Sequence, residues 1–274
     1  MPGPTVLSKR DIELIFDGAA ASYDRVGPRI FAQFGQRLAR EIPFTLGMRV
    51  LDVATGKGAV LIEAARKVGA DGRVIGVDLS GAILGEAERV VAASGLANVE
   101  LRRMDAEHLE FTDKSFDVVT CAFALFMFPD VEASLGEMYR VCRPGGYVAV
   151  TYFNSTPPPF DPGWPVFAQL CSEYQVGMRM PQKLGLAPDE LEALLRRSGF
   201  HIVKTWSERN DIVYATGEDW WAFMMTLGSR ATILSMNEDT RKRFKDAYLA
   251  RLLPALREDG LRMSTAVIYS LAKR

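Results

Sequence analysis

The chain has 274 residues and a formal net charge of −1 at pH 7, with 33 Lys and Arg against 34 Asp and Glu. Its hydrophobic and charged fractions, 48% and 24%, are those of a soluble globular protein, and the balanced charge argues against nucleic-acid binding. Three cysteines without metal-ligand spacing predict no metal site and favour a reducing compartment such as the cytoplasm. The longest wholly apolar run, residues 121–128, is too short to span a membrane.

In chain order, residues 8–40 are predicted to form two helices, and residues 48–153 alternate apolar strand-like runs with amphipathic helical patterns. The strand-like runs are nearly continuous, which is typical of parallel strands covered on both faces. A helix at 188–198 and two more strands follow, so we predict an α/β fold with a doubly wound, mostly parallel, seven-stranded sheet in a single domain, 1–274. The predicted strands are 48–53, 73–77, 99–103, 116–122, 147–153, 200–206 and 265–271.

Two long segments, 154–187 and 209–262, interrupt this alternation where loops at the carboxyl edge of the sheet are expected. Long ordered loops are usually functional, so we predict that they form a helical lid over a substrate. Their aromatic and methionine side chains would either line a substrate cavity or pack as an ordinary core. The candidate substrate-lining residues in these segments are Trp164, Trp220, Trp221, Phe223 and Met224. Phe126, which follows the fourth predicted strand, is a further candidate.

A glycine-containing turn follows the first strand of the sheet, in the sequence L-D-V-A-T-G-K-G at 51–58. Gly56 and Gly58 allow backbone N–H groups to approach a ligand at the start of the next helix. A dinucleotide pyrophosphate is disfavoured here, because Asp52 would repel it and Leu61 stands where G-x-G-x-x-G has its third glycine. A cationic ligand such as S-adenosylmethionine, with its ammonium and sulfonium groups, agrees better with an acid at this position.

Acidic residues also end the next two predicted strands. Asp78 can accept hydrogen bonds from both hydroxyls of a ribose, and Leu79 would lie against an adenine face. Asp105 could accept a hydrogen bond from the adenine amino group while the N–H of Ala106 donates to a ring nitrogen. Together with Asp52, these carboxylates would provide separate anchors for a nucleoside and an amino-acid tail.

Six stretches between residues 16 and 151 resemble class I S-adenosylmethionine-dependent methyltransferases of the ubiquinone/menaquinone-biosynthesis type, a group that includes small-molecule methyltransferases of secondary metabolism. They cover about half of the chain, in the order and spacing of that family. They read F-D-G-A-A-A-S-Y-D-R-V, L-D-V-A-T-G-K-G, V-I-G-V-D-L-S, M-D-A-E-H-L-E-F, F-D-V-V-T-C-A-F-A-L-F-M-F-P-D and V-C-R-P-G-G-Y-V-A-V.

The resemblance implies a Rossmann-like sheet with strand order 3-2-1-4-5-7-6 and an antiparallel last strand. It implies S-adenosylmethionine as cofactor and S-adenosylhomocysteine as product. Ala54 stands at the first glycine of the family's turn, and we expect it to take a negative φ. The residues that would surround the methionine part are Tyr23, Asp52, Ala54, Thr55, Gly56 and Gly58, with Ala122 and Phe123 bordering its amine or sulfonium.

The predicted reaction is in-line SN2 transfer of a methyl group to O, C or N of a hydrophobic or aromatic metabolite. Positioning carries most of such a reaction, so a base is optional. Tyr152, near the end of the fifth strand, is a candidate for orienting the acceptor. Two alternatives remain open: a cyclisation or rearrangement in which the cofactor does not react, and an NAD-dependent oxidoreductase. The acceptor, the methylated atom and the oligomeric state are left open, a homodimer included.

Overall fold

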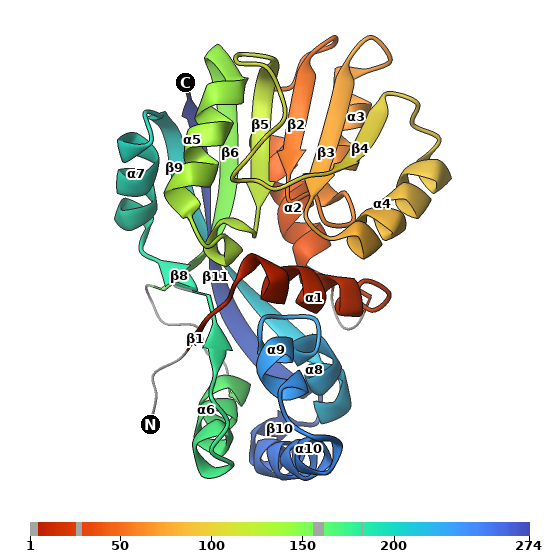
Figure 1. Ribbon diagram of the computed structural model, residues 1–274, viewed down its shortest axis with the longest axis vertical. Coiled ribbons are helices and arrows are strands. Elements are labelled where there is room, and N and C mark those ends of the chain that lie inside the picture. The colour runs from red at the N-terminus through yellow and green to blue at the C-terminus, as the bar shows by residue number, and fades with distance from the viewer. Residues whose placement is uncertain (1–4, 26–28, 156–161, 182) are drawn as a thin grey trace.

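The computed structural model describes residues 5–25, 29–155, 162–181 and 183–274 and is built around a nine-stranded sheet (Figure 1). Seven strands form a continuous path, while β9 (His201–Tyr214) pairs with β11 and β8 (Gly185–Leu186) pairs with β6. The path runs through β10 (Leu256–Arg257), β11 (Gly260–Lys273), β6 (Cys142–Asn154), β5 (Phe116–Ala122), β2 (Arg49–Val53), β3 (Arg73–Asp78) and β4 (Val99–Arg103).

The seven main strands lie in the order β4-β3-β2-β5-β6-β11-β9, so the predicted order 3-2-1-4-5-7-6 is confirmed. β11 is antiparallel to both of its long neighbours, β6 and β9, and the other neighbouring pairs in this order are parallel. The predicted strand count was too low, because the two-residue strands β8 and β10 join the sheet. Such short strands carry no recognisable hydrophobic pattern.

β9 and β11 are 14 residues long each, twice the predicted length. Their pairing continues from Lys273 opposite His201 to Leu261 opposite Tyr214, beyond the rest of the sheet. The predicted insertion 209–262 therefore begins inside β9 and ends inside β11. The polar run S-E-R-N-D at 207–211 concealed this extension, in which Ile212 and Tyr214 are buried and the ring of Tyr214 contacts Trp220 and Phe223.

Helices cover both faces of the sheet. Val50 and Leu51 are neighbours on β2, and both are fully buried because successive strand residues point to opposite faces. On the face of Val50 lie α2 (Ile30–Glu41) and α3 (Ala59–Val68). On the face of Leu51 lie α5 (Val131–Val141) and α7 (Pro188–Arg197). The connection between β3 and β4 is α4 (Gly81–Ser94).

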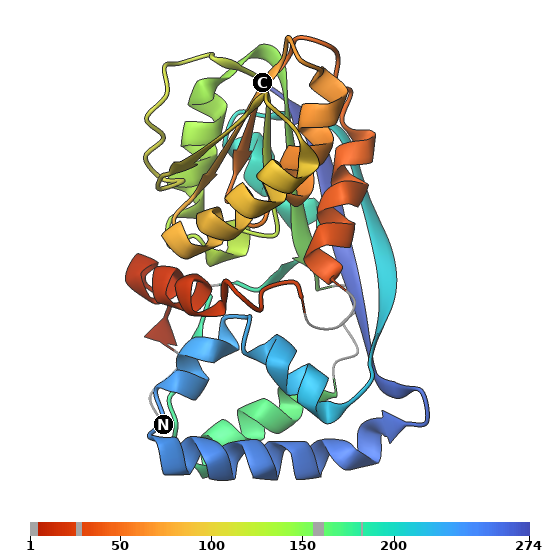
Figure 2. The ribbon, with the colours of Figure 1, turned by 90° about the vertical axis from the view of Figure 1, so that its right-hand side faces the viewer.

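A group of four helices, which we call the helical cap, lies beyond the carboxyl edge of the sheet (Figures 1 and 2). The N-terminal helix α1 (Lys9–Ala19) lies between the sheet and the cap, and β1 (Thr5–Val6) pairs with β7 (Arg179–Met180) beside it. The cap comprises α6 (Gly163–Glu173), α8 (Gly217–Met224), α9 (Ser229–Leu234) and α10 (Glu238–Leu252). The single-turn helices η1 (Leu125–Met127) and η2 (Leu253–Ala255) follow β5 and α10 in chain order.

The cap comes from the two predicted insertions, although residues 156–161 and 182 of the first lie outside the described residues. In the region of 8–40, where two helices are expected, the structure has α1 and α2, and α2 ends at Glu41. No helix in the described part of the chain combines the length and apolar character needed to cross a bilayer.

Candidate active site

The turn between β2 and α3 is held in a tight, partly left-handed conformation. Ala54 has a φ of +51°, and Gly56 and Gly58 have φ values of +56° and +86°. The expectation of a negative φ at Ala54 was therefore wrong. The left-handed conformation that Ala54 adopts costs an alanine roughly 1–2 kcal/mol. The strain persists because the turn is anchored from outside: the N–H of Thr55 donates to the carbonyl of Val77, 2.9 Å away on β3.

Asp52 lies beneath this turn, with 2% of its surface exposed. Its two carboxylate oxygens accept hydrogen bonds from the hydroxyls of Thr55 and Thr120, both at 2.6 Å. Burial raises the pKa of Asp52 to about 6, while the two hydroxyl hydrogen bonds act to lower it. Asp52 thus ties the turn to β5 from below, and the structure does not place it on the wall of the cavity described next.

A cavity with about 760 Å³ of empty space, its open mouth included, lies at the carboxyl edge of β2–β5. Asp52, Thr55 and Gly58 are behind its wall. Most of the predicted cofactor residues line it together: Tyr23, Ala54, Gly56, Asp78, Leu79, Asp105, Ala106, Ala122 and Phe123.

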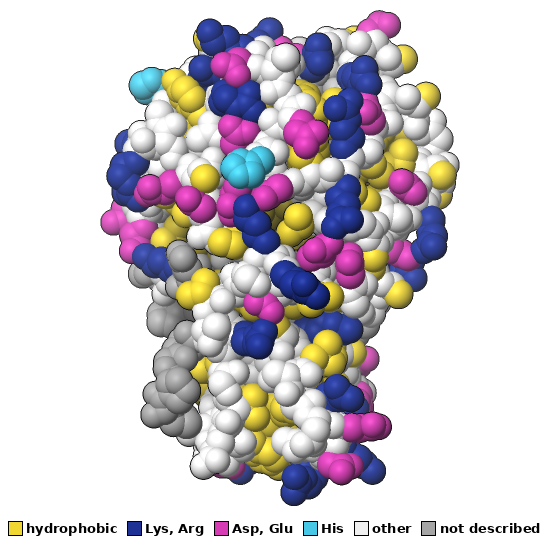
Figure 3. Space-filling model, viewed as in Figure 1, with side chains coloured by type: hydrophobic (Ala, Val, Ile, Leu, Met, Phe, Trp, Pro, Cys, Tyr) yellow, Lys and Arg dark blue, Asp and Glu magenta, His cyan; other side chains and the backbone are white. Residues whose placement is uncertain are grey.

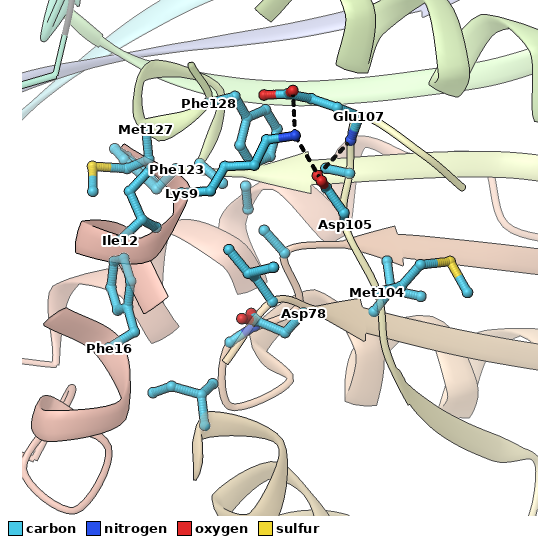
Figure 4. Close-up of a pocket in the computed structure, with 18 of the residues that line it drawn as sticks. Lys9, Ile12, Phe16, Asp78, Met104, Asp105, Glu107, Phe123, Met127 and Phe128 are labelled. Atoms are coloured by element: carbon cyan, nitrogen blue, oxygen red, sulfur yellow. Dashed lines mark hydrogen bonds and ion pairs between the residues drawn. The ribbon is translucent and has the colours of Figure 1, made fainter. Parts of the chain in front are cut away.

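Asp78 occupies the middle of the cavity (Figure 4). Its Oδ2 accepts a hydrogen bond from the N–H of Gly56 and its Oδ1 one from the N–H of Ser80, both at 3.0 Å. Burial raises the pKa of Asp78, and the backbone N–H groups act in the opposite direction. Because each carboxylate oxygen can accept more than one hydrogen bond, the fixed carboxylate can still accept from a diol such as a ribose.

Asp105 lies farther along the same wall, where a lysine that sequence reasoning missed reaches it. Lys9 Nζ is 2.7 Å from Asp105 Oδ2 and 2.5 Å from Glu107 Oε2, and the N–H of Glu107 donates to Asp105 Oδ1 at 2.9 Å (Figure 4). Burial acts to raise the pKa of Asp105, but the hydrogen bond and charge of Lys9 leave it below its usual value.

Helix α1 closes the cavity from the side opposite the sheet. Ile12 and Phe16 lie on the face of the helix that carries Lys9 and line the cavity (Figure 4). Farther along α1, Asp17 Oδ1 accepts from the Ser80 hydroxyl at 2.5 Å. The i, i+3, i+7 spacing of Lys9, Ile12 and Phe16 was the signal available in the sequence, but an amphipathic face does not say what it packs against.

Aromatic rings close the end of the cavity near Gly56. Tyr23 stacks on Phe31 with ring centroids 5.4 Å apart, and Phe31 meets Phe123 edge to face at 5.7 Å. The N–H of Phe123 donates to the hydroxyl of Thr151 at 2.9 Å, which fixes this residue at a φ of +55°. Such an aromatic end excludes water and attracts a cation.

The predicted substrate-lining residues have different surroundings. Trp220 is fully buried, and its indole N–H donates to the hydroxyl of Tyr248 at 2.7 Å inside the cap. Phe223 lines a second, smaller cavity together with Phe31. The remaining candidates, Phe126, Trp164, Trp221 and Met224, belong to or pack against the hydrophobic cores and line neither cavity.

The hydroxyl of Tyr152 donates to the carbonyl of Lys183 at 2.6 Å. Tyr152 lines neither of the two cavities, and its ring packs edge to face against Phe126 at a centroid distance of 5.6 Å. The described residues contain no group of His, Cys, Asp and Glu side chains suited to a metal ion. The cavity has carboxylate acceptors at two points, a turn of backbone N–H groups and an aromatic end. This combination fits a cationic nucleoside better than a pyrophosphate.

A family model described as a methyltransferase domain matches residues 45–212, which include the turn and the cavity residues Asp78 and Asp105. The chain belongs to this methyltransferase family. It is an S-adenosylmethionine-dependent methyltransferase acting on small molecules, and the match excludes the oxidoreductase interpretation.

Curated relatives of this methyltransferase are named after different compounds. It is 35% identical to an aklanonic acid methyltransferase of Streptomyces sp. strain C5, over 56% of this chain and 73% of the relative. It is 35% identical to a nocamycin O-methyltransferase of Saccharothrix syringae, over 53% and 51% of the two chains. It is 33% identical to a demethylmenaquinone methyltransferase of Lactobacillus johnsonii, over 59% and 69%.

Solved structures share the fold of this methyltransferase. A methyltransferase described as putative from Bacillus halodurans has a TM-score of 0.60 and 21% identity, over 88% of this chain and 98% of that one. The [4+2]-cyclase SpnF has a TM-score of 0.64 and 17% identity, over 100% and 99%. At such identities the similarity establishes the fold alone, so it does not favour a cyclase function.

Proposed function

We propose that this methyltransferase binds S-adenosylmethionine in the cavity at the carboxyl edge and methylates a hydrophobic, ring-containing metabolite. The observation that carries the proposal is that Asp78, Asp105 and the Gly56 turn line one cavity. Adenine would lie at Asp105 and Ala106, and the ribose hydroxyls at Asp78. The methionine part would then extend over the Gly56 turn toward the aromatic end.

Bound S-adenosylmethionine would supply a methyl group on a positively charged sulfur. The contribution of the chain is to hold this group in line with an acceptor, which can supply roughly 7–11 kcal/mol of the barrier reduction. Tyr23, Phe31 and Phe123 exclude water from the aromatic end and favour the cation. Asp52 keeps the turn in place through its two threonine hydrogen bonds.

The acceptor class rests on the cap and on the relatives. The cap encloses the carboxyl edge with aromatic and methionine-rich helices, which we propose as a lid of residues 154–187 and 209–262. The names of the relatives refer to aklanonic acid, nocamycin and demethylmenaquinone, so ring-containing acceptors occur among them. O- and C-methylation are both compatible with this site.

We also propose a cytoplasmic location and no nucleic-acid partner. The three cysteines are free and buried, as in proteins of reducing compartments. On the face shown in Figure 3, Lys and Arg side chains are interspersed with Asp and Glu rather than gathered in a basic patch. Sedimentation velocity would distinguish a monomer from a homodimer.

Calorimetric titration with S-adenosylmethionine tests the proposal. We expect saturable binding to the wild type and a loss of at least about tenfold in affinity for Asp78→Ala, because a fixed acceptor of two hydroxyls disappears. Asp71→Ala is the matched control, since Asp71 is exposed before the same strand. Absence of binding to the wild type, or equal losses in both variants, would overturn the proposal.

A further inference from the structure

The proposed cofactor position determines where an acceptor must approach. With adenine at Asp105 and ribose at Asp78, the reactive sulfur lies toward the aromatic end of the cavity. An in-line displacement requires the nucleophile on the far side of the methyl group. Tyr23 and Phe123 line this end, and the ring of Phe31 packs behind both of them. On its other side Phe31 contacts Phe223 of α8 at a centroid distance of 6.4 Å. Space for an acceptor beyond Tyr23 and Phe123 would therefore lie next to Phe31.

A second cavity adjoins Phe31 at this place. Four parts of the chain meet here: Asp24, the start of α2, the end of β9 and the end of α8. Its space is too narrow for a water molecule, so an entering ring has to displace lining side chains such as Phe31 or Phe223. The lining residues are Asp24, Ile30, Phe31, Tyr214, Phe223 and Thr226.

Asp24 is the charged residue of this lining. It has a left-handed φ of +52°, and its Oδ2 accepts a hydrogen bond from the N–H of Ala32 at 2.9 Å. Burial raises the pKa of Asp24, and nearby charges of Lys57 and Arg29 act to keep it ionised. The carboxylate thus holds the start of α2 and still has lone pairs for a second donor.

We propose that this second cavity is the acceptor subsite, that it takes a flat, uncharged, hydroxylated ring, and that Asp24 receives the hydroxyl proton. The proposal rests on the proposed function. Its physical basis is the combination of apolar walls, which suit a ring, with a carboxylate, which accepts an O–H donor and repels a carboxylate.

The transfer balances with these groups alone. The acceptor O–H bond breaks and its proton passes to the Asp24 carboxylate. The oxygen forms a bond to the methyl carbon, and the electron pair of the carbon–sulfur bond stays on sulfur, giving the neutral thioether S-adenosylhomocysteine. Asp24 then returns the proton to solvent when the product leaves.

Two probes with the same ring system test the subsite by binding alone. Protein saturated with S-adenosylhomocysteine is titrated near neutral pH with 1-naphthol or 1-naphthoate. We expect naphthol to bind the wild type at least about tenfold more tightly than naphthoate, because Asp24 repels the latter. Asp24→Asn retains the acceptor for the N–H of Ala32 but loses the charge. The affinity for naphthoate should therefore rise at least about tenfold relative to the affinity for naphthol.

Glu190→Gln is the matched control, because Glu190 also accepts a backbone N–H at a helix start, on the remote helix α7. It should leave the preference between the probes unchanged. Wild-type protein that binds naphthoate as tightly as naphthol, or that binds neither, would overturn the subsite. So would an unaltered preference in Asp24→Asn with an intact circular dichroism spectrum.

The same samples separate this proposal from the proposed function. S-adenosylhomocysteine binding is measured first, and its absence in the wild type would refute the cofactor site. If the cofactor product binds but the naphthol preference is missing, only the acceptor subsite is refuted.

Discussion

Lys9 Nζ lies 2.7 Å from Asp105 Oδ2 and joins the N-terminal helix to the carboxylate proposed to hold adenine. Adenine at the proposed position would share this carboxylate with Lys9 at Oδ2 and with the N–H of Glu107 at Oδ1. The second ion pair of Lys9, to Glu107, allows the lysine to stay at the cavity when it releases Asp105. We therefore expect α1 to be the element that moves when the cofactor exchanges.

Lys9→Met should therefore accelerate both association and dissociation of S-adenosylmethionine by several-fold, as measured by stopped-flow fluorescence. The effect on stability should stay below about 1 kcal/mol, because the lysine is partly exposed and screened. Lys9→Arg retains the charge and is the control. Unchanged association in Lys9→Met would show that α1 does not limit entry.

The buried carboxyl of Asp52 predicts a pH dependence of stability. Its pKa of about 6 in the folded protein lies above the value of 3.8 for an exposed aspartate. Because folding raises the pKa of Asp52, this group contributes to the free energy of unfolding below about pH 4. The contribution is lost as the pH rises through about 6. Relative to Asp52→Asn, the wild type should lose up to about 3 kcal/mol of unfolding free energy between pH 4 and pH 7. Urea denaturation of both proteins at the two pH values measures this, and a constant difference would contradict it.

Ala54 provides a test of backbone strain. Replacement by glycine relieves the left-handed conformation and should raise the unfolding free energy by up to about 1 kcal/mol. The same change at Ala65, inside α3, should lower it by about 1 kcal/mol or more. Thermal or urea denaturation of the two variants should thus give shifts of opposite sign; equal destabilisation would contradict the strain at Ala54.

Trp220 should behave as a core residue of the cap rather than as a substrate wall. Trp220→Phe leaves a small void and removes the indole donor to Tyr248, so we expect a loss of about 1–3 kcal/mol in unfolding free energy. The dissociation constant for S-adenosylmethionine should remain within about twofold of the wild type. A large loss of cofactor affinity in a folded variant would place Trp220 at the site instead.

From the sequence, the resemblance to a known family supplied the order of the central strands, and acids at successive strand ends predicted the grouping of Asp78 and Asp105 with the Gly56 turn. The grouping could be predicted because parallel strands bring their carboxyl ends to one edge, so residues at strand ends can be placed without side-chain coordinates. The alternation of helices and strands is a local pattern of hydrophobicity, and it survives unchanged in the folded chain.

Only the tertiary structure decided the position of Lys9, the orientation of Asp52 and the cavity beside Asp24. Each depends on contacts between segments far apart in the chain: Lys9 meets Asp105, Asp52 meets Thr120, and Asp24 lies near Phe223. The left-handed Ala54 and the extension of β9 and β11 into the cap have the same origin. Local preferences of a few tenths of a kcal/mol to about 1 kcal/mol per residue are overridden wherever long-range packing and hydrogen bonds contribute more.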